Sequence, residues 1–300
     1  MIETSDENTR LTPVTVLGLG PMGRALASAF LEARHPVTVW NRTPGKAGDL
    51  LERGAVAADS VQDAVESGQV IIACLIDYEA VRATLEPSQA GWGDRWLVNL
   101  TSGEPAQARQ MSLWASSRGI EYLDGAVLTP APTIGTPSAT VLFSGARDVY
   151  EAVQETMAAV GGTAVHLGDD PGQASAYEVA LLDIFSTSVN GIVHAFALAS
   201  AEGIEPERFA TFATGIGGLL PEMIKRFAQQ IQTGRYPGDR STIASAASGI
   251  THIINTATSH GIDVGMLTAA KRIIDHAVTD GYGPEGLARL TTVLQQAGRP

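Results

Sequence analysis

Hydrophobic and polar positions follow different patterns in the two halves of the chain. As far as about residue 165, short apolar runs alternate with amphipathic stretches. Runs rich in Val, Ile and Leu are typical of strands covered on both faces, and strands that alternate with helices build a doubly wound, mainly parallel sheet. The candidate strands are VTVLGL, PVTVWN, QVIIACL, RWLVNL, IEYLDGAV, ATVLFSG and TAVHLG. The first half of the chain is therefore predicted to be an α/β domain.

Helical patterns replace the strand signals from about residue 171 onward. The stretch 172–201 contains no proline, and its apolar residues recur every three or four positions. This spacing predicts one long helix that is mostly buried. We therefore expect a flexible tail over residues 1–12, an α/β domain over 13–170 and an all-α C-terminal domain over 171–300, with the long helix between the domains.

Composition and charge narrow the range of partners. The 300 residues carry a formal net charge of −12, so we expect no basic surface for nucleic acid. The opening MIETSDENTRLTP lacks the basic and apolar segments of a signal peptide, and we count no run that approaches the roughly 20 apolar residues of a membrane span. These features favour a cytoplasmic protein with no membrane contact.

Few side chains suit a disulfide or a metal. Cys74 is the single cysteine, which excludes an internal disulfide and a cysteine-based zinc site. Its apolar surroundings indicate a buried core thiol. His194, His252 and His260 lie on predicted helices without a His or Asp partner at metal-ligand spacing. We interpret them as structural or pocket-lining residues and predict no metal site.

A glycine-rich loop follows the first predicted strand and opens a helix. Gly18, Gly20 and Gly23 form the pattern G-x-G-x-x-G. In a Rossmann domain the first glycine allows a tight turn, the second lets the backbone approach a pyrophosphate, and the third allows close helix–strand packing. The anion then lies on the N–H groups of the helix N-terminus. We expect a dinucleotide to contact Gly18, Leu19, Gly20, Pro21, Met22 and Gly23.

The end of the second predicted strand distinguishes NADP from NAD. An NAD site has an acidic residue about 20 positions after the loop, where it binds the adenosine ribose. This chain instead has Asn41, Arg42 and Thr43, with Lys46 one turn later. Arginine can pair with a 2′-phosphate, which an aspartate would repel. The sequence therefore predicts NADPH as the cofactor.

Several motifs together resemble a known family. The motifs LGLGPMG, VWNRT, NLTSG, YLDGA and GTPSATVLFSG precede an all-helical half. This combination is similar to the imine reductase branch of the β-hydroxyacid dehydrogenase superfamily. The resemblance implies an NADPH-binding domain, a long interdomain helix and a helical domain for dimerisation and substrate binding. It also implies a domain-swapped homodimer, whose active site joins the cofactor domain of one subunit to the helical domain of the other.

The long helix separates the imine reductases from the hydroxyacid enzymes. The resemblance leads us to expect a catalytic lysine there in a hydroxyacid enzyme, whereas no lysine occurs between residues 170 and 200. The Ser-Gly-Gly loop that binds the substrate carboxylate in those enzymes is replaced by DGAVLTPAPTIGTP, and a later lysine is missing near Ser248. A carboxylate substrate would therefore meet few cationic or N–H partners.

The same helix supplies the candidate acid. Imine reductases place Asp or Tyr at the matching position, and the resemblance places Glu178 there, one residue after Tyr177. A carboxylate suits a cationic substrate because it can stabilise an iminium ion or supply its proton. Glu178 is either an active-site carboxylate or a solvated one, and Tyr177 is either a proton donor or a core residue.

The motif NLTSG and a neighbouring strand add further candidates. Ser102 follows a strand end, where the resemblance implies a Ser or Asn near the reacting centre. Thr101 beside it and Leu75 are expected to contact the cofactor, with a loop or core role as the alternative.

The leading prediction is an NADPH-dependent reductase that transfers hydride to an imine or iminium carbon and yields an amine, with reductive amination as an extension. One alternative is an NADP-dependent β-hydroxyacid or short-aldehyde dehydrogenase, which the missing lysines and glycine pair disfavour. An alternative of another class is a non-catalytic NADP(H) sensor that kept the glycine loop.

Overall fold

The computed structural model describes residues 11–88 and 90–297, so the predicted tail falls almost entirely outside the described residues. The chain divides into two compact units, Met1–Phe185 and Ser186–Pro300. The division falls inside the long helix α7 (Gln173–Ala201).

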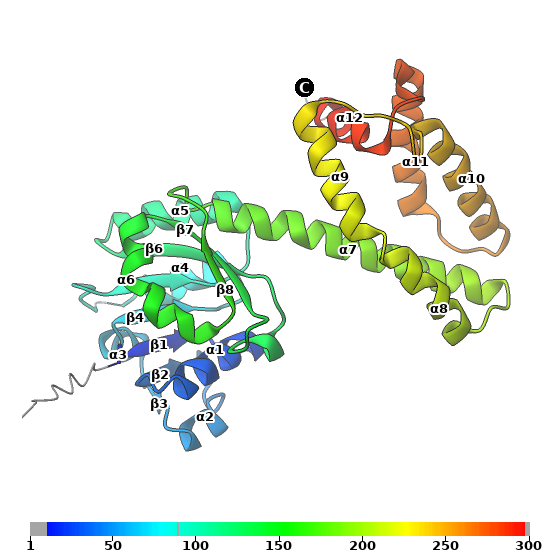
Figure 1. The fold of residues 1–300 in the computed structure, drawn as a ribbon. Helices are drawn as coiled ribbons and strands as arrows, with labels where there is room; N and C mark the ends of the chain where they lie inside the picture. The colour runs from blue at the N-terminus through cyan, green and yellow to red at the C-terminus, as the bar shows by residue number, and fades with distance from the viewer. Residues whose placement is uncertain (1–10, 89, 298–300) are drawn as a thin grey trace, which may run out of the picture. The chain divides into compact units, whose positions relative to one another are not determined.

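The first unit is built on an eight-stranded sheet (Figure 1). Its strand order is β3-β2-β1-β4-β5-β6-β7-β8, and all neighbours are parallel except β6 and β7. All seven predicted strands are present, and only the two-residue strand β3 was not predicted. The strands are β1 (Val14–Leu17), β2 (Val37–Trp40), β3 (Val56–Ala57), β4 (Val70–Ala73), β5 (Trp96–Asn99), β6 (Glu121–Val127), β7 (Thr140–Gly145) and β8 (Thr163–His166).

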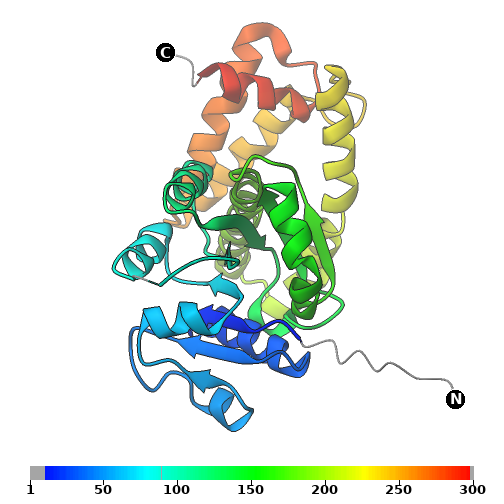
Figure 2. The ribbon, with the colours of Figure 1, turned by 90° about the vertical axis from the view of Figure 1, so that its left-hand side faces the viewer.

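Helices cover both faces of this sheet because alternate residues of its strands point in opposite directions. In β4, Val70 and Ile72 pack in one apolar cluster, while Ile71 and Ala73 pack in the other. In Figure 2, α4 and α5 lie on one side of the sheet and α6 on the other. The helices are α1 (Pro21–Glu32), α2 (Asp49–Glu52), α3 (Val61–Ser67), α4 (Tyr78–Leu85), α5 (Pro105–Ser116) and α6 (Arg147–Met157), with the 3-10 turns η1 (Ala131–Thr133) and η2 (Ala158–Val160).

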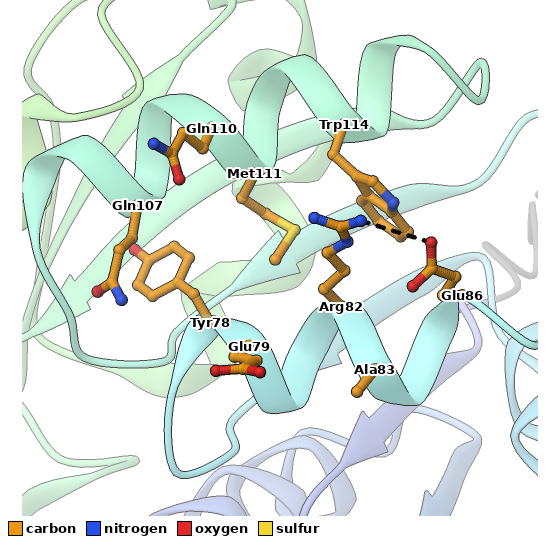
Figure 3. Close-up of a pocket in the computed structure, with 9 residues that line it drawn as sticks. All are labelled: Tyr78, Glu79, Arg82, Ala83, Glu86, Gln107, Gln110, Met111 and Trp114. Carbon is orange, nitrogen blue, oxygen red and sulfur yellow. Dashed lines mark ion pairs between the residues drawn. The ribbon is translucent and has the colours of Figure 1, made fainter.

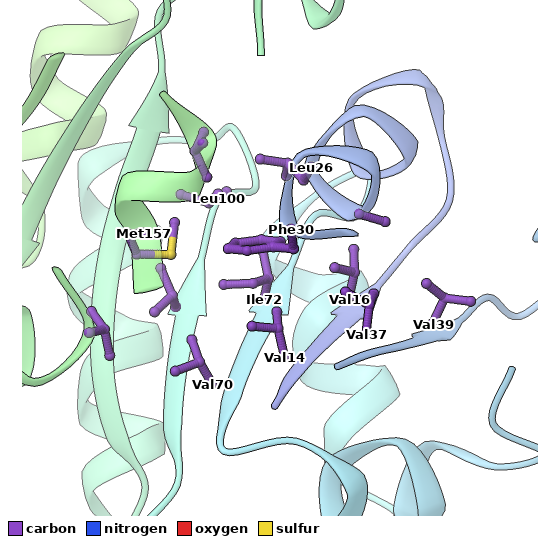
Figure 4. Packing of buried hydrophobic residues seen from close by; sticks show 14 of the residues in the cluster. Val14, Val16, Leu26, Phe30, Val37, Val39, Val70, Ile72, Leu100 and Met157 are labelled. Atoms are coloured by element: carbon purple, nitrogen blue, oxygen red, sulfur yellow. The ribbon is translucent and has the colours of Figure 1, made fainter. Parts of the chain in front are cut away.

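The larger apolar cluster fixes helix α1 on the sheet. Phe30 is fully buried and lies between α1 and the strands, close to Ile72 (Figure 4). Met157 at the end of α6 joins the same cluster. This packing holds the N-terminus of α1 beside the end of β1, which is where a dinucleotide loop must lie.

The regular elements described in the second unit are all helices, beside one isolated β-bridge between Thr242 and Gly286, which confirms the predicted fold class. A small cluster around Ile243, Ile274, Ala277 and Val293 joins α10, α11 and α12. The elements are α8 (Pro206–Gly217), α9 (Leu220–Thr233), α10 (Ile243–Ser259), α11 (Gly265–Ala277), the π-helical turn η3 (Val278–Tyr282), the 3-10 turn η4 (Leu287–Arg289) and α12 (Leu290–Ala297).

The prediction that the long helix is mostly buried is wrong for the single chain. Leu182, Phe185 and Val193 are 48%, 66% and 64% exposed. The apolar residues of α7 are spread around its axis, so one neighbouring element could cover only part of them. By length and composition alone, α7 is also the one described helix that could cross a membrane, although the core helix of a soluble protein meets the same criterion.

Candidate active site

The carboxyl ends of the parallel strands meet along one edge of the sheet. The register places Trp40, Leu17, Ala73, Asn99 and Asp124 side by side on β2, β1, β4, β5 and β6. The chain reverses its direction of strand addition between β1 and β4, which is the switch point where ligands bind in open α/β sheets. The loops that leave these strands carry most of the predicted site residues.

The glycine loop has the geometry that a pyrophosphate requires. Gly18 has a φ of +99°, and a Cβ there would overlap the carbonyl oxygen of Cys74. A Cβ at Gly23 would overlap the carbonyl oxygen of Gly18, so both positions need glycine. At Gly20, by contrast, nothing lies within 4 Å of the Cβ position. That open space, directly before the N-terminus of α1, can receive an anion.

Asn41 joins the glycine loop to the end of β2. Its Oδ1 accepts a hydrogen bond of 3.0 Å from the Leu19 N–H, and its Nδ2 donates to the Thr43 carbonyl at 2.9 Å. Arg42 and Thr43 are exposed and line a groove along this edge of the sheet. Lys46 is also exposed, but it does not line the groove. Asn41 therefore holds the loop in shape, and Arg42 is the cation that faces the groove.

The groove along this edge has a volume of about 400 Å³. Leu75 lines it, and the Leu75 N–H donates to Thr101 Oγ1 at 3.1 Å. Thr101 itself is only 1% exposed, so its side chain lies behind the groove wall. The lining residues are Gly18, Leu19, Gly20, Pro21, Met22, Gly23, Trp40, Asn41, Arg42, Thr43, Cys74, Leu75, Ile76, Ala80 and Thr84. A glycine cradle at one end and an arginine in place of an acid at the other fit NADPH.

Glu178 and Ser102 meet beside this edge of the sheet. Ser102 Oγ donates to Glu178 Oε1 at 2.5 Å, and the backbone N–H of Gly103 donates to the same carboxyl group. Glu178 is 6% exposed although it carries a carboxyl group. Burial raises the pKa of Glu178, and the two hydrogen bonds act in the opposite direction because they stabilise the carboxylate.

Tyr177, the neighbouring candidate, points to a different side of α7. Its side chain is 49% exposed, whereas Glu178 is buried. The structure thus brings Glu178 and Ser102 together, and Tyr177 lies on the exposed surface of the single chain.

An ion pair fixes the beginning of α7. Arg109 on α5 binds Asp170 through Nε and Nη2, at 2.9 and 2.7 Å, and Asp170 Oδ1 also accepts the Gly172 N–H at 3.0 Å. Gly172 allows the close approach, since a Cβ there would lie 2.7 Å from Cζ of Arg109. The pair holds the helix that carries Glu178 against α5.

A buried polar cluster around Asp124 was missed by the sequence analysis. Asp124 lies in the middle of β6 and has no exposed surface. Its Oδ1 accepts hydrogen bonds from the hydroxyls of Tyr78 and Tyr122 at 2.7 and 2.6 Å, and its Oδ2 accepts from Ser175 Oγ at 3.1 Å. The sequence signal for this cluster was a charged residue at the centre of the apolar strand YLDGA. Charged residues are rarely buried unless they are paired.

Burial dominates the titration of Asp124. It raises the pKa of Asp124 to about 7, while hydrogen bonds from Tyr122, Tyr78 and Ser175 act in the opposite direction. Burial also raises the pKa of the Tyr78 and Tyr122 hydroxyls. Asp124 is thus a buried carboxyl group that is partly protonated near neutral pH.

A second groove lies on the far side of Tyr78, between α4 and α5 (Figure 3). It has a volume of about 520 Å³, with Tyr78 and Gln107 at one end and Arg82, Glu86 and Trp114 at the other. Its lining mixes charged and amide side chains with Met111 and Trp114, and it includes no glycine. The candidate site is therefore the groove at the carboxyl edge.

The remaining candidates have structural contacts. Cys74 is partly buried at the end of β4, and burial raises its pKa to about 11. In the second unit, His194 contacts the Asp263 carbonyl at 3.1 Å and His260 contacts Glu202 at 2.8 Å. Over the described parts of the chain, no cluster of three or more His, Cys, Asp or Glu could hold a metal ion.

Comparisons with known proteins cover nearly the whole chain. Residues 13–168 match the NAD binding domain of 6-phosphogluconate dehydrogenase, and residues 170–296 match the C-terminal domain of NADPH-dependent reductive aminase-like proteins. The NADPH-dependent reductive aminase of Aspergillus oryzae is 31% identical over 285 residues, which are 92% of this chain and 95% of that protein. The chain belongs to the reductive aminase and imine reductase family.

Solved members of this family share its fold. An imine reductase from Myxococcus stipitatus in complex with NADP⁺ superposes with a TM-score of 0.89 at 32% identity and covers 94% of this chain and 99% of that one. A reductive aminase from Aspergillus terreus in complex with NADPH and ethyl levulinate gives 0.90 at 32% identity, with 95% and 99% covered. Family membership thus extends over both units.

Proposed function

We propose that this protein is an NADPH-dependent reductase that converts imines to amines. The observation that carries the proposal is the buried carboxyl group of Glu178, which faces Ser102 beside the cofactor edge of the sheet, on a helix with no lysine between residues 170 and 200. The named activities of the similar family members support it.

The chain's own residues can hold NADPH. The glycine loop binds the pyrophosphate, Gly20 leaves room for it, and Arg42 with Thr43 meets the 2′-phosphate. Asn41 keeps the loop in position through the Leu19 N–H. When bound, NADPH supplies the hydride for reduction of the C=N bond.

Glu178 serves the nitrogen of the substrate. An imine accepts hydride most readily as the iminium ion, because its positive charge makes the carbon more electrophilic. A carboxylate at Glu178 stabilises that cation, and in its protonated form it supplies the proton. Burial favours the protonated form, whereas Ser102 and Gly103 favour the carboxylate, so both forms are accessible. Tyr177 is the second candidate for the proton donor.

A homodimer completes the site. Helix α7 carries many apolar side chains. In the single chain about half of the surface of Leu182 and two thirds of that of Phe185 are exposed. A second copy of the chain would bury them, as expected of an obligate interface. We place the dimerisation and substrate functions in residues 171–300, propose exchange of helical domains between subunits, and propose that the enzyme works in the cytoplasm.

Reductive amination is an extension of the same chemistry. A ketone and an amine condense with loss of water, and the resulting iminium ion is reduced by the same hydride transfer. The A. oryzae relative is named a reductive aminase, and one A. terreus structure contains cyclohexanone and allyl amine. These names support a carbonyl and an amine as joint substrates.

A pair of spectrophotometric assays tests the proposal. We expect NADPH oxidation with 1-pyrroline or a dihydroisoquinoline, and no NADP⁺ reduction with 3-hydroxyisobutyrate. The variant Glu178→Gln should lower kcat by roughly 10²- to 10⁴-fold, the range of general acid–base catalysis. The matched control Glu155→Gln, which removes an exposed carboxyl group from α6, should retain full activity.

Each competing function has its own outcome in these assays. Turnover of the hydroxy acid alone would establish a dehydrogenase. Tight NADPH binding without turnover of any imine would establish a sensor. Full imine reduction by Glu178→Gln would contradict the role of Glu178, and the double variant with Tyr177→Phe would then show whether Tyr177 supplies the proton.

A further inference from the structure

The turn of α7 that carries Glu178 is held to the sheet at two points. Ser175 and Glu178 are three residues apart, so their side chains lie on the same side of the helix. Ser175 Oγ donates to Asp124 on β6, and Glu178 accepts a hydrogen bond from Ser102 in the loop after β5. The position of Glu178 along the sheet edge therefore depends on both contacts.

Tyr78 links Asp124 to the second contact. Its hydroxyl lies 2.7 Å from Asp124 Oδ1 and 3.1 Å from Ser175 Oγ, so it joins strand β6 to α7. The edge of its ring packs on Gly103, where a Cβ would lie 2.5 Å from Cδ2 of Tyr78. The Gly103 N–H is one of the two donors to Glu178. A displaced Tyr78 ring would therefore move a donor to the Glu178 carboxyl group.

From this geometry we propose that Asp124 is a positioning residue, which holds Glu178 in place while the substrate accepts the hydride. One route runs from Asp124 through Ser175 on α7. The other runs from Asp124 through Tyr78 to Gly103. Asp124 itself has no exposed surface with which to touch a substrate or a cofactor. The inference rests on the proposed function, because it assigns Asp124 its role through Glu178.

The surroundings of Asp124 argue against a role in packing alone. A carboxyl group without exposed surface costs folding free energy, even where hydroxyl groups donate to it. The groups around it are Tyr78 on α4, Tyr122 on β6, Asn99 on β5 and Ser175 on α7. All four are uncharged hydroxyl or amide groups, so no described cation compensates the charge.

Replacing Asp124 by asparagine or by alanine separates the contribution of its hydrogen bonds from that of its charge. Asp124→Asn keeps an oxygen that accepts from Tyr78, and its amide can donate to Ser175 Oγ. Asp124→Ala removes both contacts. Ser175→Ala breaks the direct contact with α7 while it leaves the core of the sheet intact. Tyr122→Phe is the matched control, because it removes a donor to Asp124 whose described hydrogen bonds join only β5 and β6.

The titration of Glu178 provides a readout that does not depend on turnover. Protein labelled with ¹³C at the glutamate carboxyl carbons is titrated by NMR, and the Glu178 signal is identified by its loss in Glu178→Gln. We expect Asp124→Ala and Ser175→Ala to raise the pKa of Glu178, because its hydrogen bonds from Ser102 and Gly103 weaken. Asp124→Asn and Tyr122→Phe should leave it unchanged.

Steady-state kinetics give the second readout. We expect Asp124→Ala and Ser175→Ala to lower kcat for imine reduction by roughly 10- to 100-fold with little change in KM for NADPH, since they move a group that acts in the transition state. Asp124→Asn should restore most of this loss. If Asp124 had only a structural role, the variants would be less stable and the pKa of Glu178 would not change.

The outcomes distinguish this inference from the proposed function. An unshifted Glu178 titration in both Asp124→Ala and Ser175→Ala, in an active enzyme, would overturn the positioning role alone. A shifted Glu178 titration in these variants, together with a wild-type protein that reduces no imine, would support the positioning of Glu178 and overturn the proposed function. A shift with a parallel loss of kcat would support both.

Discussion

Replacing Arg42 by alanine should weaken the binding of NADPH and leave the binding of NADH nearly unchanged. Arg42 is exposed on the wall of the cofactor groove. Its neighbours are occupied by other contacts: Arg24 is paired with Asp49, and the amide of Asn41 binds the Leu19 N–H and the Thr43 carbonyl. Arg42 is therefore the cation that we assign to the 2′-phosphate, the group that NADH lacks.

The size of the effect follows from the exposure of the site. A hydrogen bond to a charged group contributes about 1.5–3 kcal/mol to binding. Because Arg42 is exposed, solvent and salt screen the interaction, and we expect the lower end of this range. A loss of about 1.4 kcal/mol corresponds to a tenfold change in affinity. The Kd for NADPH should rise about tenfold, and by less at high ionic strength.

Calorimetric titration of wild type and variant with both cofactors, at low and high salt, measures this change. Arg53→Ala is a suitable control, since Arg53 pairs with Glu32 on the outer surface of α1 and has the same charge. The control should bind both cofactors as the wild type does. Equal weakening of NADPH and NADH binding by Arg42→Ala would refute the assignment of Arg42 to the 2′-phosphate.

Two further predictions concern the sheet edge. Gly20→Ala should fold normally and bind NADPH more weakly. Gly23→Ala should lower Tm as well, because its Cβ, unlike that of Gly20→Ala, would overlap the Gly18 carbonyl. Measurements of Tm and of the Kd for NADPH test both variants, and equal Tm values would contradict the argument. Since burial raises the pKa of Asp124 to about 7, the native state binds more protons than the unfolded chain between pH 4 and 7, and stability falls as pH rises through that interval. Asp124→Asn should remove up to ~4 kcal/mol of this loss, so its Tm relative to wild type should increase from pH 5 to pH 8; a constant difference would contradict the burial argument.

The parts of the fold that depend on local patterns could be predicted from the sequence. Apolar runs located all strands of the sheet except β3, which has only two residues and both exposed. The glycine loop and the Asn41–Thr43 stretch identified the cofactor edge because backbone geometry and charge act over short distances along the chain. Family resemblance, rather than periodicity, indicated Glu178 as a candidate site residue.

Contacts between distant segments could not be predicted in the same way. Asp124, Tyr78 and Ser175 are far apart in sequence, and a cluster of this kind exists only after β6, α4 and α7 have packed. The apolar pattern of α7 predicted that its side chains are buried. Such a pattern does not identify the chain against which they pack. Phe185 is 66% exposed in the single chain, so the apolar character of the helix was predicted correctly, whereas its burial is not provided by the single chain.

Glu178 is held by the first unit, although its helix α7 continues into residues of the second. Its described hydrogen bonds lie within the first unit: Ser102 and Gly103 bind its carboxyl group, and the helix that carries it is held through Ser175 and through the Arg109–Asp170 pair. Glu178 is therefore fixed relative to the glycine loop by contacts within one compact unit.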